Sequence, residues 1–170
     1  MKIYLLSCAM TLMAVSLLVS CNKDDDEDTG NSQSGTYRYF QPCLQWESNV
    51  AGVRTYMKTL KGWSEAPNID PEDNQIDFVY KDSRALMTYT FKDGGLIGSN
   101  LTYFQCNEAF DNFMNDVTKE FGLTWSALQS YQGKEWYSSS ITSMSSNISI
   151  GKSSLQGGYM YVDFSYIEYV

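Results

Sequence analysis

The chain has 170 residues, of which 43% are hydrophobic and 15% aromatic, and its formal net charge is −8 at pH 7. It contains no histidine, so Ser-His-Asp and Cys-His catalysis and the common histidine-containing zinc sites are excluded. Its 12 basic side chains are scattered and outnumbered by 20 acids, which disfavours a nucleic-acid partner, because phosphate backbones are bound through clustered Lys and Arg. We expect no metal and no organic cofactor.

Residues 1–20 have the pattern of a signal peptide. Lys2 provides a short positive start, an apolar run follows, and the small residue Ser20 precedes Cys21. The run is too short for a membrane span, which needs about 20 apolar residues. Leu18-Val19-Ser20-Cys21 fits a lipobox, so Cys21 is predicted to become a lipidated N-terminus. The alternative is an ordinary secretory peptide with an incidental cysteine.

This start resembles a bacterial lipoprotein signal, and Lys23 followed by acidic residues 24–28 resembles the surface-export tag of Bacteroidetes-type lipoproteins. The resemblance implies acyl chains on Cys21, anchorage in the outer membrane and exposure at the cell surface. Each buried CH₂ of those chains would contribute about 0.8 kcal/mol to membrane binding. Taken by themselves, the acids indicate a solvated spacer, since blocks of like charge repel.

The rest of the chain divides into a tether and one domain. Residues 21–36 are acidic and then rich in Gly, Asn, Ser and Gln, which predicts a disordered tether. Residues 37–170 are enough for a single domain with its own core, which needs no metal for stability.

Two similar patterns follow each other in this domain, roughly 63 residues apart. After each cysteine, apolar side chains recur at i, i+4, i+7 and i+11, the spacing of one helix face. The two sets are Trp46, Val50, Val53 and Met57, then Phe110, Met114, Val117 and Phe121. Ser48 and Asn107 are the predicted N-caps. Trp63 and Trp125 follow the two helices, and the pairs Gly94-Gly95 and Gly157-Gly158 precede the last strand of each half.

Runs of β-branched and aromatic residues predict three strands in each half. They cover residues 76–80, 86–91, 96–104, 136–143, 148–150 and 159–169. Asp93-Gly94 predicts a type I′ hairpin turn, and residues 67–74 predict a polar loop. The predicted fold is therefore α+β, with two tandem helix-strand-strand-strand repeats, about 43–105 and 106–169. These would form an antiparallel sheet with both helices on one face.

This layout resembles two groups of proteins. The capped helix after a cysteine and Trp46, followed by three strands, resembles small Bacteroidetes lipoproteins of unknown function. The order of elements is similar to the tandem-repeat β-lactamase inhibitor protein fold. A likeness of element order implies a fold and not an activity.

Cys43 and Cys106 occupy equivalent places in the two halves. Export to an oxidising compartment permits a disulfide between them, which needs Cα atoms within roughly 7 Å. Two separate buried thiols are the alternative, and the sequence does not choose between them.

The last strand alternates between two kinds of side chain. Met160, Val162, Phe164 and Tyr166 are predicted to face the core. Tyr159 and Tyr161 then face outward and, with Tyr89 or Tyr103 from neighbouring strands, would form an aromatic platform for a sugar or a protein partner. Tyrosine also suits any exposed pleated surface, so the platform is one of two interpretations.

Three further patterns indicate no site. The loop acids Asp70, Glu72 and Asp73 fit no calcium loop and are expected to be solvated. Gly151-Lys152-Ser153 lacks the earlier glycine of a phosphate loop. The four tryptophans, Trp46, Trp63, Trp125 and Trp136, are expected to close the ends of the core.

These observations predict a non-enzymatic, lipid-anchored binding protein whose partner, a protein or a glycan, meets the exposed sheet face. One alternative is a hydrolase that uses carboxylates alone, which requires two acids with shifted pKa values in one pocket. The other is a structural envelope lipoprotein with a uniformly polar outer face.

Overall fold

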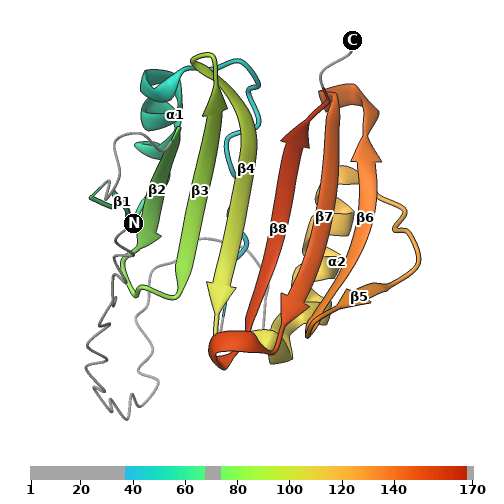
Figure 1. Cartoon of the computed structure of the whole chain (residues 1–170). Helices are drawn as coiled ribbons and strands as arrows, with labels where there is room; N and C mark the ends of the chain where they lie inside the picture. The colour runs from blue at the N-terminus through green and yellow to red at the C-terminus, as the bar shows by residue number, and fades with distance from the viewer. Residues whose placement is uncertain (1–36, 68–73, 168–170) are drawn as a thin grey trace, which may run out of the picture. The chain divides into compact units, whose positions relative to one another are not determined.

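The computed structural model describes residues 37–67 and 74–167. These form one eight-stranded antiparallel sheet and two α-helices, so the fold is α+β as predicted (Figure 1). The helices are α1 (Val50–Met57) and α2 (Phe110–Phe121). The strands are β1 (Trp63–Glu65), β2 (Gln75–Tyr80), β3 (Ala85–Lys92), β4 (Gly95–Phe104), β5 (Gln129–Tyr131), β6 (Lys134–Ile141), β7 (Ser146–Ser153) and β8 (Tyr159–Tyr166). Short 3₁₀ turns are η1 (Asn107–Ala109), η2 (Thr142–Met144) and η3 (Leu155–Gly157).

A strand is present at each of the six predicted places, but β6 ends at Ile141 and β8 at Tyr166, earlier than predicted, and residues 168 and 169 of the last prediction lie outside the described ranges. The strands run in the order β1-β2-β3-β4-β8-β7-β6-β5, so β4 and β8 meet at the centre. The unpredicted strands β1 and β5 have three residues each and form the two edges. Three residues are too few to show an alternating pattern, and a short edge offers little backbone to a second chain.

Two tight turns determine how neighbouring strands meet. Asp93 and Gly94 have φ values of 52° and 83°, as a type I′ turn requires, which confirms the hairpin between β3 and β4. Gln132 and Gly133, with φ values of 47° and 78°, form a similar turn between β5 and β6.

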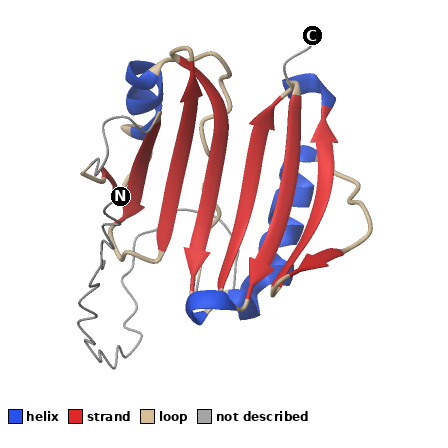
Figure 2. Cartoon of the chain, in the orientation of Figure 1, coloured by secondary structure: helices blue, strands red, loops and turns tan. Residues whose placement is uncertain are grey.

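Both helices cover the same face of the sheet (Figure 2). Tyr89 of β3 is paired with Ser99 of β4, which is paired with Phe164 of β8, and residues paired across strands share a face. Tyr89 Oη lies 3.1 Å from Met57 Sδ of α1. Phe164 packs edge-on against Phe121 of α2, with ring centroids 5.4 Å apart. The core therefore lies between this face and the helices.

No helix in the described ranges is long and apolar enough to cross a bilayer.

A stretch without helix or strand, residues 37–46, crosses the covered face from α2 to α1; we call it the N-terminal strap. At its start, Tyr37 donates a hydrogen bond to Asp116 of α2 and packs edge-on against Phe113. Further along, side chains bond to its main chain and so satisfy its buried polar groups. These bonds run from Tyr103 Oη to Arg38 O, from Tyr56 Oη to Gln41 O (2.7 Å), from Ser99 Oγ to Cys43 O (2.7 Å) and from Cys43 N to Tyr89 Oη (3.1 Å).

The helix caps differ from the predicted ones. Asn49, and not Ser48, caps α1, because its Oδ1 accepts a hydrogen bond from Gly52 N at 2.9 Å. Asn107 does not cap α2, because η1 is inserted between this residue and the helix. Its Nδ2 instead donates to Ser153 O at 2.9 Å, which ties η1 to the end of β7.

Tyr89→Phe tests the importance of the strap. The change leaves the buried Cys43 N–H without its acceptor, so we expect the free energy of unfolding to fall by about 1–3 kcal/mol. Denaturant unfolding monitored by circular dichroism measures it. Tyr161→Phe is the matched control, because Tyr161 lies on the opposite face, and it should change stability by less than about 0.5 kcal/mol. Equal losses in the two variants would contradict a special role for the strap.

Candidate binding surface

The face of the sheet turned away from the helices is covered by no described helix or loop, and we call it the open face (Figure 2). Tyr159 and Tyr161 of β8 lie on it and are half-buried, while Met160, Val162 and Phe164 between and beyond them are buried. The predicted alternation of β8 is therefore confirmed.

The register of the sheet gathers aromatic side chains at one end of the open face. One cross-strand row consists of Phe104, Tyr159, Ser153, Lys134 and Tyr131, from β4 to β5. The next row consists of Thr102, Tyr161, Gly151, Trp136 and Gln129. Phe104, Tyr131, Trp136, Tyr159 and Tyr161 together form what we call the aromatic end. Tyr131 is 66% exposed and Phe104 38% exposed, so part of the aromatic surface is accessible. With strands about 4.8 Å apart, five strands give a row about 19 Å long.

Gly151 explains how Tyr161 is held on this surface. A Cβ atom at Gly151 would lie only 2.7 Å from Tyr161 Oη and 2.5 Å from the backbone oxygen of Glu135. The ring of Tyr161 therefore lies over Gly151 of the neighbouring strand β7, where no side chain is in its way. This packing restrains the ring, so less rotamer freedom would be lost when a ligand stacks on it.

A polar row lies directly beside the aromatic end. It contains Asn100, Asp163, Ser149 and Ser138, from β4 to β6. Asn100 Nδ2 donates to Asp163 Oδ1, and Thr102 Oγ1 donates to Asn100 Oδ1 at 2.7 Å. The open face thus combines fixed amide, carboxylate and hydroxyl groups with aromatic rings.

Partial burial alters the titration of two groups on this face. Desolvation raises the pKa of Asp163, although the Asn100 hydrogen bond and the charge of Lys134 oppose the rise. Desolvation also raises the pKa of Tyr161, to about 12, with a further contribution from the Asp163 charge. Asp163 is therefore a carboxylate that a new hydrogen-bond donor would stabilise.

Tyr89 and Tyr103 do not join this surface, and their predicted place on the platform is wrong. Their side chains are 0% and 3% exposed, and both lie on the helix-covered face. Tyr103 is paired with Met160, which is buried, and Tyr89 with Ile76, also buried. The faces of β3 and β4 follow from their register against β8, which no local pattern in the sequence reveals.

Cys43 and Cys106 are both buried and are not bonded to each other in this structure. Burial raises the pKa of both Cys43 and Cys106, which lowers their reactivity. The predicted lipidation site Cys21 and the loop acids Asp70, Glu72 and Asp73 lie outside the described residues.

Three of the four tryptophans pack against the core as predicted, namely Trp46, Trp63 and Trp125. Trp136 is different, because it is paired with Gly151 on the open face. The sequence signal that could have located it is the turn-forming pair Gln132-Gly133, which predicts a hairpin ending near Lys134. Gly151-Lys152-Ser153 lies within β7 and forms no phosphate loop.

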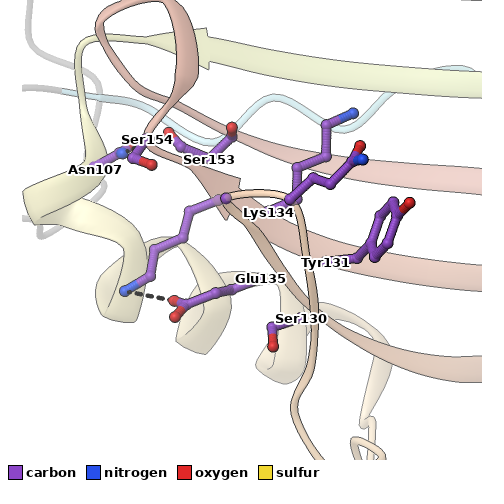
Figure 3. A pocket seen from close by; sticks show the side chains of 10 residues that line it. Asn107, Ser130, Tyr131, Lys134, Glu135, Ser153 and Ser154 are labelled. Carbon is purple, nitrogen blue, oxygen red and sulfur yellow. Dashed lines mark hydrogen bonds and ion pairs between the residues drawn. The ribbon is translucent and has the colours of Figure 1, made fainter.

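A hollow of about 650 Å³ lies next to the aromatic end, where the β5–β6 hairpin meets the end of β7 and η1 (Figure 3). Its lining residues are Asn107, Ser130, Tyr131, Gln132, Gly133, Lys134, Glu135, Lys152, Ser153 and Ser154. Glu135 and Lys152 form an ion pair at 3.6 Å. Asn107 Oδ1 is buried and accepts no hydrogen bond from the described residues. Such an acceptor costs about 1–3 kcal/mol unless a donor reaches it.

The described residues contain no group of three or more Cys, Asp or Glu side chains suited to a metal ion.

No protein-family model matches the chain, and no curated protein or solved structure is significantly similar to it. The open face and the adjoining hollow are therefore the features from which a function must be inferred.

The raised pKa of Asp163 predicts a pH dependence of stability. Because the folded protein holds the Asp163 proton more tightly than the unfolded chain, stability is lost as the pH rises from the unfolded-state pKa through the folded-state pKa. Asp163→Asn removes this titration and keeps an oxygen for Asn100 Nδ2. The difference in stability between the variant and the unmodified protein should therefore shift in favour of the variant when the pH is raised from 4 to 7. Thermal unfolding at both pH values measures the gain, and parallel pH profiles would contradict it.

Proposed function

We propose that this chain is a lipid-anchored, non-enzymatic protein of the outer membrane that binds a glycan through the open face. The observation that carries the binding proposal is the cross-strand register, which places five aromatic side chains in two neighbouring rows beside a polar row. The anchor rests on the sequence around Cys21, and the surface location on the acidic residues 24–28.

The anchor is tested by replacing its proposed attachment site. Cys21→Ala removes the sulfur that would carry the lipid, so the full-length protein should move from the membrane fraction to the soluble fraction. It should also lose incorporation of labelled palmitate, while the unmodified protein keeps both properties. Surface exposure is measured separately by protease treatment of intact cells. A Cys21→Ala variant that stays in the membrane fraction would contradict the lipid anchor.

The chemistry of the open face favours a glycan. The C–H faces of sugar rings pack on aromatic side chains, and sugar hydroxyls both donate and accept hydrogen bonds. Rings are present at the aromatic end, and the Asn100–Asp163 pair offers polar groups at the adjacent row. The row beyond this polar row has small side chains with hydroxyl or amide groups, such as Ser140 and Asn147. A linear, neutral, hydroxyl-rich chain fits a row of this length and composition.

Charge also separates a glycan from other partners. Acidic and basic side chains are nearly equal in number within the described residues, so most of the excess acid lies elsewhere in the chain. Charged groups are sparse on the open face, where Asp163 and Lys134 lie at or beside the aromatic end and Asp77 of β2 lies further along the row of Asp163. A strongly charged partner would find little to complement here. The alternative hydrolase needs two converging carboxyl groups, whereas the neighbour of Asp163 is the amide of Asn100.

Glycan binding is tested by replacing aromatic side chains. Trp136→Ala and Tyr131→Ala should each weaken binding about tenfold, equal to about 1.4 kcal/mol, because each removes a ring on which a sugar stacks. Isothermal titration with laminarin, xylan, mannan and pullulan measures the affinity, and a ligand-induced change in tryptophan fluorescence that is lost in Trp136→Ala reports contact with that ring.

Lys58→Ala is the control, because Lys58 is exposed at the end of α1, on the other side of the sheet from the open face. It should leave the affinity unchanged. Absence of binding to all four polysaccharides, together with recovery of a protein that binds the aromatic end, would replace the glycan with a protein partner. A chain that binds neither would favour the structural alternative.

We further propose that the domain arose by duplication of a helix-and-strands unit, about 43–105 and 106–169. In support, each half has a helix followed by one short and three longer strands, and the strand order is mirrored about β4 and β8. The resemblances to Bacteroidetes lipoproteins and to the β-lactamase inhibitor protein fold are likewise proposals, based on residues 18–28 and on element order. A superposition of the two halves in which helix and strands fail to overlay would contradict the duplication.

A further inference from the structure

We propose that the hollow at the β5–β6 hairpin is an end-recognition subsite, which takes the terminal sugar unit of a glycan lying on the aromatic end. This inference rests on the proposed glycan binding and adds to it a preference for chain ends.

The hollow is continuous with the aromatic end. Tyr131 and Lys134 are cross-strand partners in the outermost row of the open face, and both also line the hollow. Ser130 and Glu135 are the next cross-strand pair along the same hairpin. They lie on the opposite face of the sheet and also line the hollow. The lining therefore includes groups from both faces of the hairpin, and Figure 3 shows Tyr131 and Lys134 together with Ser130 and Glu135.

The groups in the hollow suit a hydroxyl-rich ligand. The carboxylate of Glu135 can accept hydrogen bonds from a ligand in the hollow. Asn107 also lines the hollow, and its buried Oδ1 receives no hydrogen bond from the described residues. Lys134 and the serine hydroxyls supply donors. A sugar unit offers donors and acceptors on several sides and so matches this mixture, whereas an apolar ligand would leave these groups unpaired. The volume of about 650 Å³ lies within the range of small-ligand pockets.

The position of the hollow indicates a chain end. Its walls come from the β5–β6 hairpin, the end of β7 and Asn107 of η1. A glycan that follows the aromatic rows from β4 to β5 reaches these walls at the edge of the sheet. The unit that enters the hollow is therefore the last one, while internal units stay on the rings.

The test fills the hollow without touching the open face. Ser130 is exposed, lines the hollow and faces away from the aromatic rows, so Ser130→Trp should obstruct only the hollow. Glu135→Gln is a second, nearly isosteric variant that removes an acceptor charge. Ala51→Trp is the matched control, because Ala51 is exposed on α1, on the other side of the sheet from the open face. Thermal unfolding confirms that each variant is folded.

The measurement compares polymers with short fragments. Isothermal titration is carried out with laminarin, xylan, mannan and pullulan and with a hexasaccharide derived from each. Ser130→Trp and Glu135→Gln should weaken hexasaccharide binding about fivefold to tenfold, because every fragment presents ends. They should change the affinity for the parent polymer less than twofold, because internal segments of the polymer outnumber its ends. Trp136→Ala should weaken both, and Ala51→Trp neither.

The outcomes separate the two proposals. If both hollow variants bind the hexasaccharide as tightly as the unmodified protein, or lose polymer and fragment binding equally, the end subsite is overturned and glycan binding by the open face stands. If the unmodified protein binds neither polymers nor hexasaccharides, both proposals are overturned.

Discussion

The N-terminal strap is the constraint on which the rest of this structure depends. Helices of 8 and 12 residues are too few to cover an eight-stranded face, and residues 37–46 fill the space between them. A stretch without secondary structure can lie in a core only if its peptide groups find partners. Tyr56, Ser99 and Tyr103 donate to its carbonyl groups, and Tyr89 accepts from one of its amides.

The strap also connects the two halves of the sheet. Trp46, at its end, stacks on Tyr166 of β8, and its Nε1 donates to Met144 O and Ser146 Oγ, each at 2.8 Å. These partners lie about 100 residues further along the chain. A contact between such distant parts is slow to form, because the entropy of closing the loop must be overcome first. Once formed, it holds the strap across the covered face of the sheet.

The tyrosines of this chain consequently divide into two groups with different chemistry. Tyr89 and Tyr103 use their hydroxyl groups to satisfy buried backbone, and burial raises the pKa of each. Tyr159 and Tyr161 lie on the uncovered face of the sheet and are half-buried. The same residue type therefore stabilises the fold on one face and supplies the proposed binding surface on the other.

The sequence alone determined the local elements, because the period of apolar residues depends only on backbone geometry. It identified both helices, six strands, the Asp93-Gly94 turn and the outward direction of Tyr159 and Tyr161. It misplaced Tyr89 and Tyr103, and it did not find Trp136 on the open face or the hollow at the β5–β6 hairpin. Those features depend on which strands pair, in which register, and on which face the strap covers. Only tertiary structure decides them, because they arise from contacts between residues far apart in the chain.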